Sequence, residues 1–236
     1  MSKLILIPGL ACDAGMWRDQ LPGLTPDWHA EVTDVATRCP SIEAMAAALL
    51  AEHAGALVLC GASMGGMVAM EAAHQAPDRI RGLALLGTSA RPETPDMQAL
   101  REQAIALFEQ GRAEEVLRAN VAFAFDRQHP DLKALAARYF ALILRAGTDQ
   151  LVRQNRAVIA RPDARQHLRQ VRCPTLVVTG LADSLTPPDC AREIAGLVPG
   201  AELHLVPRCG HMLTMEQPDA VNALLQGWLA RLPAAT

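Results

Sequence analysis

Residues 56–70 constrain the fold more than any other stretch of this sequence. The apolar run Ala56–Cys60 is too short for a helix and suits a buried strand. A sharp turn follows at Gly61-Ala62-Ser63-Met64-Gly65, and the next residues favour a helix. In this strand–turn–helix context, the G-x-S-x-G pattern presents a serine hydroxyl at the carboxyl edge of a sheet. Ser63 is therefore a candidate nucleophile, and the alternative is a serine that only caps the helix.

Strands and helices alternate over most of the chain. The sequence predicts further strands at Lys3–Ile7, Ala30–Val35, Ile80–Leu86, Thr175–Thr179 and Glu202–Val206. It predicts helices at Ile42–His53, Pro188–Leu197 and Pro218–Leu232, and a short helical turn at Gly15–Leu21. This alternation indicates an α/β fold with a mainly parallel sheet and helices on both of its faces.

A purely helical segment interrupts this alternation. We expect helices at Pro95–Glu109, Arg112–Phe125, Asp131–Ala146, Asp149–Ala160 and Ala164–Leu168, with no convincing strand among them. We interpret residues 92–169 as a helical cap, inserted into one core domain made of residues 1–91 and 170–236.

Charge and composition exclude several classes of protein. The net charge of −3 argues against a nucleic-acid partner. No apolar run reaches the length of a membrane helix, and the first residues do not resemble a signal peptide. The six cysteines form no C-x-x-C pair, and we expect reduced thiols. Together these features predict a cytoplasmic protein without membrane partners.

Two further loops carry side chains that a reactive serine needs. A serine hydroxyl requires a base within hydrogen-bond reach, and the base requires an acid that orients it. Asp183 follows the predicted strand Thr175–Thr179, and His211 follows Glu202–Val206. Each alone is typical of an ordinary loop, but the order serine, aspartate, histidine at three strand ends predicts a nucleophilic triad. Asp189 is the alternative acid.

The sequence resembles the α/β-hydrolase family over nearly its whole length. The resemblance is carried by Pro8-Gly9-Leu10, Gly61-Ala62-Ser63-Met64-Gly65-Gly66, Gly180-Leu181-Ala182-Asp183 and Gly210-His211. It implies that Ser63 is the nucleophile, that His211 acts as general base and then acid, and that Asp183 orients His211. It also implies an oxyanion hole formed by the backbone N–H groups of Leu10 and Met64, and no cofactor.

The chain departs from the family pattern at two places. Pro8 stands where the family commonly has a histidine, which affects how the first loop is braced. The first predicted strand begins at Lys3, without the family's usual antiparallel pair before it. We therefore expect about six strands rather than eight.

These features predict a serine hydrolase that cleaves a carboxylic ester, or a related acyl substrate, through an acyl-enzyme. The same triad also serves related enzymes that hydrolyse carbon–carbon bonds, open enol-lactones or carry out perhydrolysis. A small-molecule-binding protein of the same fold, without catalysis, is the alternative from another class. The remaining histidines lie on or beside helices and strands without H-E-x-x-H or Cys–His ligand spacing, so we expect no metal.

The second half of the cap is strongly basic. Residues 133–172 contain nine Lys and Arg residues against two Asp. This excess predicts either attraction of an anionic acyl substrate or simply solvated helix faces. The apolar cap residues are expected partly to line an acyl pocket and partly to pack on the core: Leu107, Phe108, Phe123, Phe125, Phe140, Leu144 and Val152. The sequence leaves open whether the protein is a monomer or a homodimer.

Overall fold

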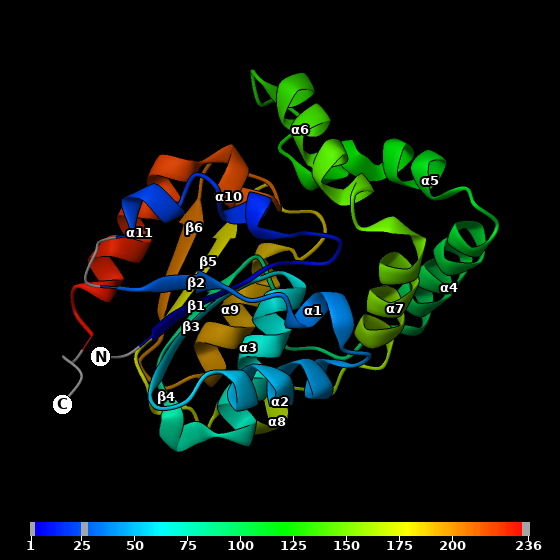
Figure 1. Cartoon of the computed structure of the whole chain (residues 1–236). Coiled ribbons are helices and arrows are strands. Elements are labelled where there is room, and N and C mark those ends of the chain that lie inside the picture. Colours follow the sequence, from blue (N-terminus) through cyan, green and yellow to red (C-terminus); the bar gives the residue numbers. More distant parts are fainter. Residues whose placement is uncertain (1–2, 25–27, 233–236) are drawn as a thin grey trace.

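The computed structural model describes residues 3–24 and 28–232, and these residues form one six-stranded parallel sheet (Figure 1). The strands are β1 (Lys3–Ile7), β2 (Ala30–Val32), β3 (Leu57–Ala62), β4 (Ile80–Leu86), β5 (Thr175–Gly180) and β6 (Glu202–Val206). Their order in the sheet is β2-β1-β3-β4-β5-β6, and every neighbouring pair is parallel. The strand order therefore reverses between β1 and β3. In such sheets the crevice at the carboxyl ends beside this reversal is where ligands bind.

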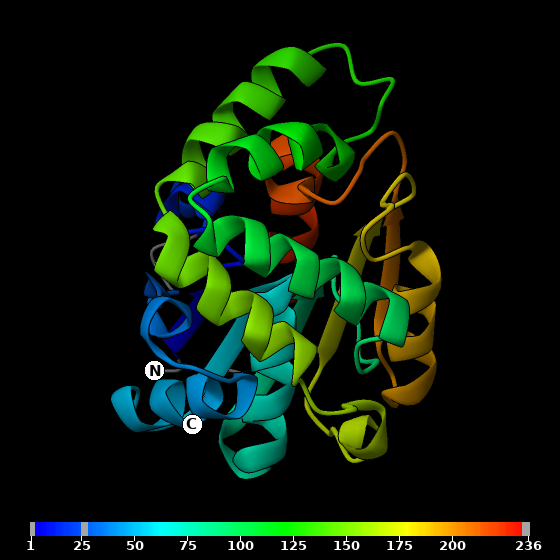
Figure 2. The ribbon, with the colours of Figure 1, turned by 90° about the vertical axis from the view of Figure 1, so that its right-hand side faces the viewer.

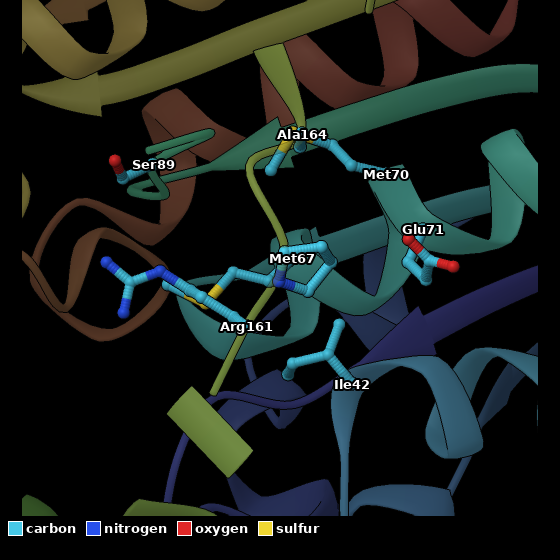
Figure 3. Close-up of a pocket in the computed structure, with 8 residues that line it drawn as sticks. Ile42, Met67, Met70, Glu71, Ser89, Arg161 and Ala164 are labelled. Atoms are coloured by element: carbon cyan, nitrogen blue, oxygen red, sulfur yellow. The ribbon is translucent and has the colours of Figure 1, made fainter. Parts of the chain in front are cut away.

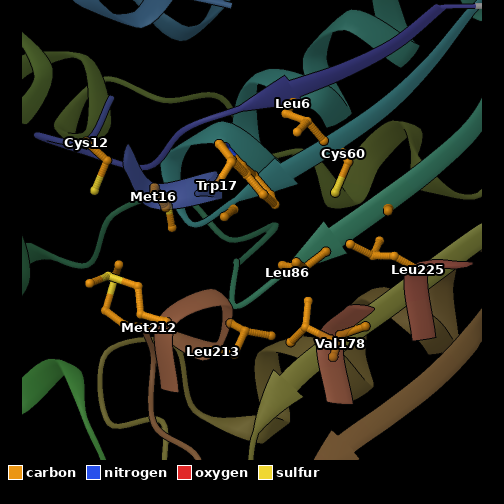
Figure 4. Packing of buried hydrophobic residues seen from close by; sticks show 14 of the residues in the cluster. Leu6, Cys12, Met16, Trp17, Cys60, Leu86, Val178, Met212, Leu213 and Leu225 are labelled. Carbon is orange, nitrogen blue, oxygen red and sulfur yellow. The ribbon is translucent and has the colours of Figure 1, made fainter. Parts of the chain in front are cut away.

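The two faces of the sheet bury separate apolar cores, because side chains alternate along each strand. Leu4 and Leu6 of β1 pack with the face covered by α10 (Leu213–Glu216) and α11 (Pro218–Leu229). Figure 4 shows Leu6, Trp17 and Leu225 in this cluster. Each large side chain buried in this way contributes roughly 1.5–3 kcal/mol.

Other helices cover the opposite core. Ile5 and Ile7 of β1 pack with α2 (Ile42–Glu52), α3 (Met64–Gln75) and α9 (Pro188–Leu197). Ser41 caps α2 by accepting the N–H of Ala44 at 3.2 Å. Both faces of the parallel sheet are thus covered, which explains why its central strands are almost continuously apolar.

The segment between β4 and β5 is helical, as expected. It contains α4 (Pro95–Glu109), α5 (Ala113–Asn120), η4 (Val121–Ala124), α6 (Leu132–Leu144), α7 (Gly147–Ile159) and α8 (Arg165–Leu168). Helices α4–α6 lie apart from the helices that cover the sheet (Figures 1 and 2), whereas α7 contacts α1. Helix α8 instead contacts α3 and α9. The limits of the cap at residues 92 and 169 stay predictions.

Several predicted elements are confirmed and three are wrong. Five strand and helix predictions match to the residue: Lys3–Ile7, Ile80–Leu86, Pro95–Glu109, Pro188–Leu197 and Glu202–Val206. The predicted strand Ala30–Val35 ends at Val32, because Thr33 Oγ1 accepts the Val35 N–H and α1 (Val35–Arg38) begins there.

The other two errors concern helices. The predicted helix Arg112–Phe125 breaks at Asn120, whose side chain donates to the Val116 carbonyl oxygen, and continues as the tighter η4. Helix α10 was not predicted, because its four residues lie between the His211 loop and Pro218. The predicted turn Gly15–Leu21 corresponds to two short 3₁₀ helices, η1 (Ala14–Trp17) and η2 (Leu21–Gly23). A third, η3 (Pro77–Arg79), precedes β4.

The six cysteines all lie in the described part of the chain, and all are free thiols. Cys12, Cys60, Cys190 and Cys209 are buried. Burial, and to a lesser extent the nearby Asp13 carboxylate, raises the pKa of Cys12 to about 12. Such a thiol stays protonated near neutral pH and packs as a small apolar group. None of the described helices combines the length and the apolar character needed to cross a bilayer.

Candidate active site

The turn from β3 into α3 forces Ser63 into a backbone conformation that residues other than glycine rarely adopt. Its φ is 54° and its ψ is −119°, at a typical cost of about 1–3 kcal/mol. The glycines on either side permit the turn. A Cβ on Gly61 would lie 2.2 Å from the Gly65 carbonyl oxygen, and one on Gly65 would lie 2.0 Å from that of Ile7. The turn therefore holds the Ser63 side chain at the end of the sheet, immediately before the first residue of α3.

The structure brings Ser63, His211 and Asp183 together. The Nε2 atom of His211 lies 3.0 Å from the Ser63 Oγ atom. The Nδ1 atom of His211 lies 2.9 Å from Asp183 Oδ2. Ser63 is partly exposed, whereas His211 and Asp183 are buried. This geometry allows His211 to take the hydroxyl proton while Asp183 fixes the tautomer of the ring.

The loop after β5 holds the Asp183 carboxylate ionised. Asp183 Oδ1 accepts the N–H groups of Leu185 and Thr186, both at 2.9 Å. Asp183 Oδ2 accepts the Thr186 hydroxyl at 2.8 Å in addition to its contact with His211. Burial raises the pKa of Asp183, but His211 and the Thr186 donors outweigh it, so the pKa is lowered overall. The site therefore holds a charged acid at neutral pH.

Two backbone N–H groups beside Ser63 are available for a ligand. Among the residues that the structure describes, neither the Leu10 N–H nor the Met64 N–H donates to a protein acceptor. The first loop lies against the serine, since a Cβ on Gly9 would be 3.3 Å from the Ser63 Cβ. These are the two donors that the family resemblance assigned to an oxyanion hole.

The first loop is held in place by the cap. Ala11 has a positive φ of 59°, and its N–H donates to Gln154 Oε1 at 2.7 Å. Gln154 lies on α7, has no exposed surface, and donates its Nε2 to the Ala36 carbonyl oxygen at 2.8 Å. A fully buried amide thus fixes the backbone next to Leu10.

The alternative acid and the other histidines lie outside this group. The Asp189 side chain is 79% exposed and pairs with Arg192 on its own helix, at 2.9 Å. His74 of α3 and His167 of α8 stack, with ring centroids 4.1 Å apart. Within residues 3–24 and 28–232, no three His, Cys, Asp or Glu side chains are placed to bind a metal ion.

The positive charges of the cap are largely paired with acids elsewhere in the chain. Arg138 contacts Asp19 at 2.7 Å and Arg145 contacts Asp13 at 2.9 Å. Further pairs join Arg156 to Glu109 and Arg161 to Glu93, and Arg165 lies 3.8 Å from Glu193. In the folded protein, nearby acids therefore neutralise much of the positive charge counted along residues 133–172.

The apolar residues of the cap divide into two sets. Phe108, Phe125 and Val152 are buried in the same core cluster as Cys12 and Met212. The side chains of Phe123 and Leu144 are 44% and 40% exposed. Phe140 lies beneath the Arg118 guanidinium, 4.4 Å from the ring centroid.

Two hollows lie away from the triad. One of about 10 Å³ is lined by Met67, Met70, Glu71 and Arg161 among others (Figure 3), and it has room for about one water molecule. A larger one of about 590 Å³ lies between α7 and the start of α2, with Pro40, Arg153 and Arg156 in its walls. Neither is lined by Ser63, Asp183 or His211.

Sequence reasoning missed Thr186, Gln154 and Glu216. Thr186 follows Asp183 closely in the same loop, where a hydroxyl beside a candidate acid was an available signal. Glu216 is a buried acid in the otherwise apolar run after His211, and that contrast was also available. Gln154 gave no signal, because its contacts join segments more than a hundred residues apart.

Comparison with known proteins places this geometry in context. The model of a family described as the Alpha/beta hydrolase family matches residues 4–224. The pimeloyl-acyl-carrier protein methyl ester esterase of Neisseria meningitidis serogroup B (strain H44/76) is 25% identical, covering 97% of this chain and 93% of that protein. The structure of a thermophilic esterase from Thermogutta terrifontis matches with a TM-score of 0.86 and 27% identity, over 98% of this chain and 90% of that one. The enol-lactonase from Burkholderia xenovorans LB400 matches with a TM-score of 0.88 at 21% identity, over 98% and 92% of the two chains, and shows the fold alone.

Proposed function

Because this chain belongs to the alpha/beta hydrolase family, we propose that it is a serine hydrolase that cleaves a carboxylic ester through an acyl-enzyme. The observation that carries the proposal is the chain of contacts from Ser63 Oγ to His211 Nε2 and from His211 Nδ1 to Asp183. Named esterases among the relatives and structural matches support the same reaction class.

In the first half of the proposed reaction, Ser63 attacks the ester carbonyl. His211 takes the hydroxyl proton, and Asp183 stabilises the imidazolium that forms. The carbonyl oxygen gains negative charge, and the N–H groups of Leu10 and Met64 are the donors proposed to receive it. His211 then protonates the departing alcohol, which leaves an ester between Ser63 and the acyl group.

In the second half, water replaces the alcohol. His211 removes a proton from the water, the hydroxide attacks the acyl-enzyme, and the acid leaves as Ser63 regains its proton. Each of these steps uses a side chain or backbone group of this chain, so the proposed reaction requires no cofactor.

For the substrate, we propose a small acyl ester. The name of the Neisseria relative specifies a methyl ester of a pimeloyl group, and such an ester is a reasonable first member of a test series. The pairing of Arg138 and Arg145 with Asp19 and Asp13 reduces the field available to attract an anion. An anionic substrate remains a prediction, as do the carbon–carbon bond, enol-lactone and perhydrolysis reactions.

A substrate panel tests the proposal. The panel contains p-nitrophenyl esters of increasing chain length, monomethyl pimelate, an enol-lactone and a dienoate, each incubated with the wild type and with Ser63→Ala. We expect ester hydrolysis that Ser63→Ala abolishes. If only the lactone or only the dienoate is turned over, that compound's class becomes the proposed substrate class in place of esters. Binding of these compounds without turnover by the wild type would support the non-catalytic alternative.

A further inference from the structure

The loop that carries His211, residues 207–212, has no regular structure of its own between β6 and α10. Three consecutive backbone N–H groups in it nevertheless have acceptors outside the loop. The N–H groups of His211 and Met212 both donate to the Ala124 carbonyl oxygen, at 2.9 and 3.0 Å. The Gly210 N–H donates to Glu216 Oε2 at 2.7 Å. The backbone on both sides of His211 is therefore fixed by groups from η4 and α10.

The second oxygen of Glu216 extends the same arrangement into the cap. Glu216 Oε1 accepts the N–H of Asp126 at 2.7 Å, two residues after Ala124. One carboxylate thus binds a cap N–H and a histidine-loop N–H together. The two backbones approach so closely that a Cβ on Gly210 would lie 2.6 Å from the Phe125 carbonyl carbon.

We propose that Glu216 is a positioning residue for His211, which holds the histidine loop and the cap segment 124–126 in one fixed arrangement. This inference rests on the proposed function, because its consequence is the alignment of the His211 ring with Ser63. The hydrogen bonds of the Glu216 carboxylate are to the backbone N–H groups of Asp126 and Gly210, and not to the His211 ring or the Ser63 hydroxyl. Glu216 therefore acts through the backbone.

The surroundings of Glu216 fit a role as a fixed double acceptor. The residue is only 4% exposed and lies on α10, one turn after His211. Hydrogen bonds from N–H groups to a carboxylate are shorter and stronger than neutral ones, and both contacts are short. Burial raises the pKa of Glu216, while the two N–H donors oppose that rise. A glutamine at position 216 would offer only one acceptor oxygen for the N–H groups of Gly210 and Asp126. Its NH₂ group would face the second of these donors.

The experiment uses Glu216→Gln, Glu216→Asp and the matched control Glu71→Gln. Glu71 is another buried acid, 7% exposed, on α3 (Figure 3), and it accepts from Gln75 at 2.8 Å. We compare kcat and KM for p-nitrophenyl butyrate and ethyl butyrate, together with Tm. The ethyl ester depends more on His211, because ethoxide must be protonated as it leaves, whereas p-nitrophenolate leaves unaided.

A misaligned base predicts a specific pattern. In Glu216→Gln, kcat for the ethyl ester falls by about tenfold or more, kcat for the p-nitrophenyl ester falls less, and KM stays within about threefold. Glu216→Asp keeps the charge but is one methylene shorter, and we expect the same pattern. Glu71→Gln lowers Tm without changing the ratio of the two kcat values. Wild-type kcat values for both esters in the Glu216 variants, at whatever Tm, overturn the proposal.

Amide hydrogen exchange over residues 209–212 gives a readout that needs no turnover. Exchange faster in Glu216→Gln or Glu216→Asp than in Glu71→Gln supports the proposed positioning, and equal rates in all three contradict it. If one Glu216 variant fails to fold, the other decides the result. A wild type that hydrolyses no ester of the panel overturns the proposed function, whereas an active wild type with unaffected Glu216 variants overturns only the role of Glu216.

Discussion

The Nε2 atom of His211 lies 3.0 Å from Ser63 Oγ, although 148 residues separate the two along the chain. The parallel sheet accounts for this proximity. Ser63 follows β3 and His211 follows β6, so both stand at the same edge, where all the strands end. Asp183, after β5, completes the set from the strand between β4 and β6.

Replacement of Asp183 by asparagine is expected to remove most of the activity. The amide allows the wrong His211 tautomer, and the change lowers kcat by about 10⁴-fold in enzymes with this arrangement. Asp189→Asn is the matched control, since its side chain is exposed and pairs with Arg192. Steady-state kinetics on a p-nitrophenyl ester compares the two variants. Near-normal turnover in Asp183→Asn would show that another acid serves His211.

Replacement of Gly65 by alanine is expected to destabilise the whole protein. The added Cβ would lie 2.0 Å from the Ile7 carbonyl oxygen, so β1 and α3 must separate. We expect the free energy of unfolding to fall by about 3 kcal/mol or more. Gly196→Ala on α9 has open space around its Cβ and should gain about 0.5–1 kcal/mol. Urea unfolding measures both, and equal stabilities would contradict the close packing of the turn.

Replacement of Gln154 by methionine tests whether the cap fixes the first loop. It leaves the Ala11 N–H and the Ala36 carbonyl without partners, which costs about 1–3 kcal/mol for each group. Asn155→Leu is the control, because its amide bonds only to Arg101 and Leu151 within the cap. Both variants should lose stability, but only Gln154→Met should lower kcat. Equal kcat values for the two variants, measured in buffer without urea, would contradict a role of Gln154 in positioning the loop that carries Leu10 and Ala11.

The stacked pair of His74 and His167 predicts a loss of stability in mild acid. Burial, and then the neighbouring His74, lowers the pKa of His167 below its ordinary value of 6.5. The unfolded chain therefore binds a proton more readily than the folded one, and stability rises with pH in this window. The free energy of unfolding should fall as the pH drops from 7 through about 6.5 and below, until the folded ring is also protonated. His167→Gln should show a smaller fall over the same range, and an identical pH profile would contradict the assignment.

The parts of the fold that depend on local pattern could be predicted from the sequence. The apolar runs of β1 and β4 are bounded by charged, proline or glycine residues, and their limits match the structure. The turn around Ser63 was also predictable from Gly61 and Gly65. The structure shows why glycine is needed there, since a Cβ at either position would clash with the backbone. The family was predicted correctly from the combination of these local motifs.

Features that depend on contacts between distant segments could not be predicted. The charge of the cap depends on partners such as Asp13 and Asp19, which lie more than a hundred residues earlier than Arg145 and Arg138. The double contact of Glu216 likewise joins α10 to a residue ninety positions away. A sequence pattern reports on residues that are close together along the chain. These contacts instead depend on how the cap packs against the core.

The most direct measurement of the proposed mechanism is the mapping of a fluorophosphonate adduct by mass spectrometry. The reagent reacts with a serine only when a neighbouring base has activated it. We expect one adduct on Ser63 in the folded wild type and none in His211→Ala, with Asp189→Asn labelled like the wild type. Folded wild-type protein that remains unlabelled, or a His211→Ala variant labelled at Ser63 at the same rate, would contradict activation of Ser63 by His211.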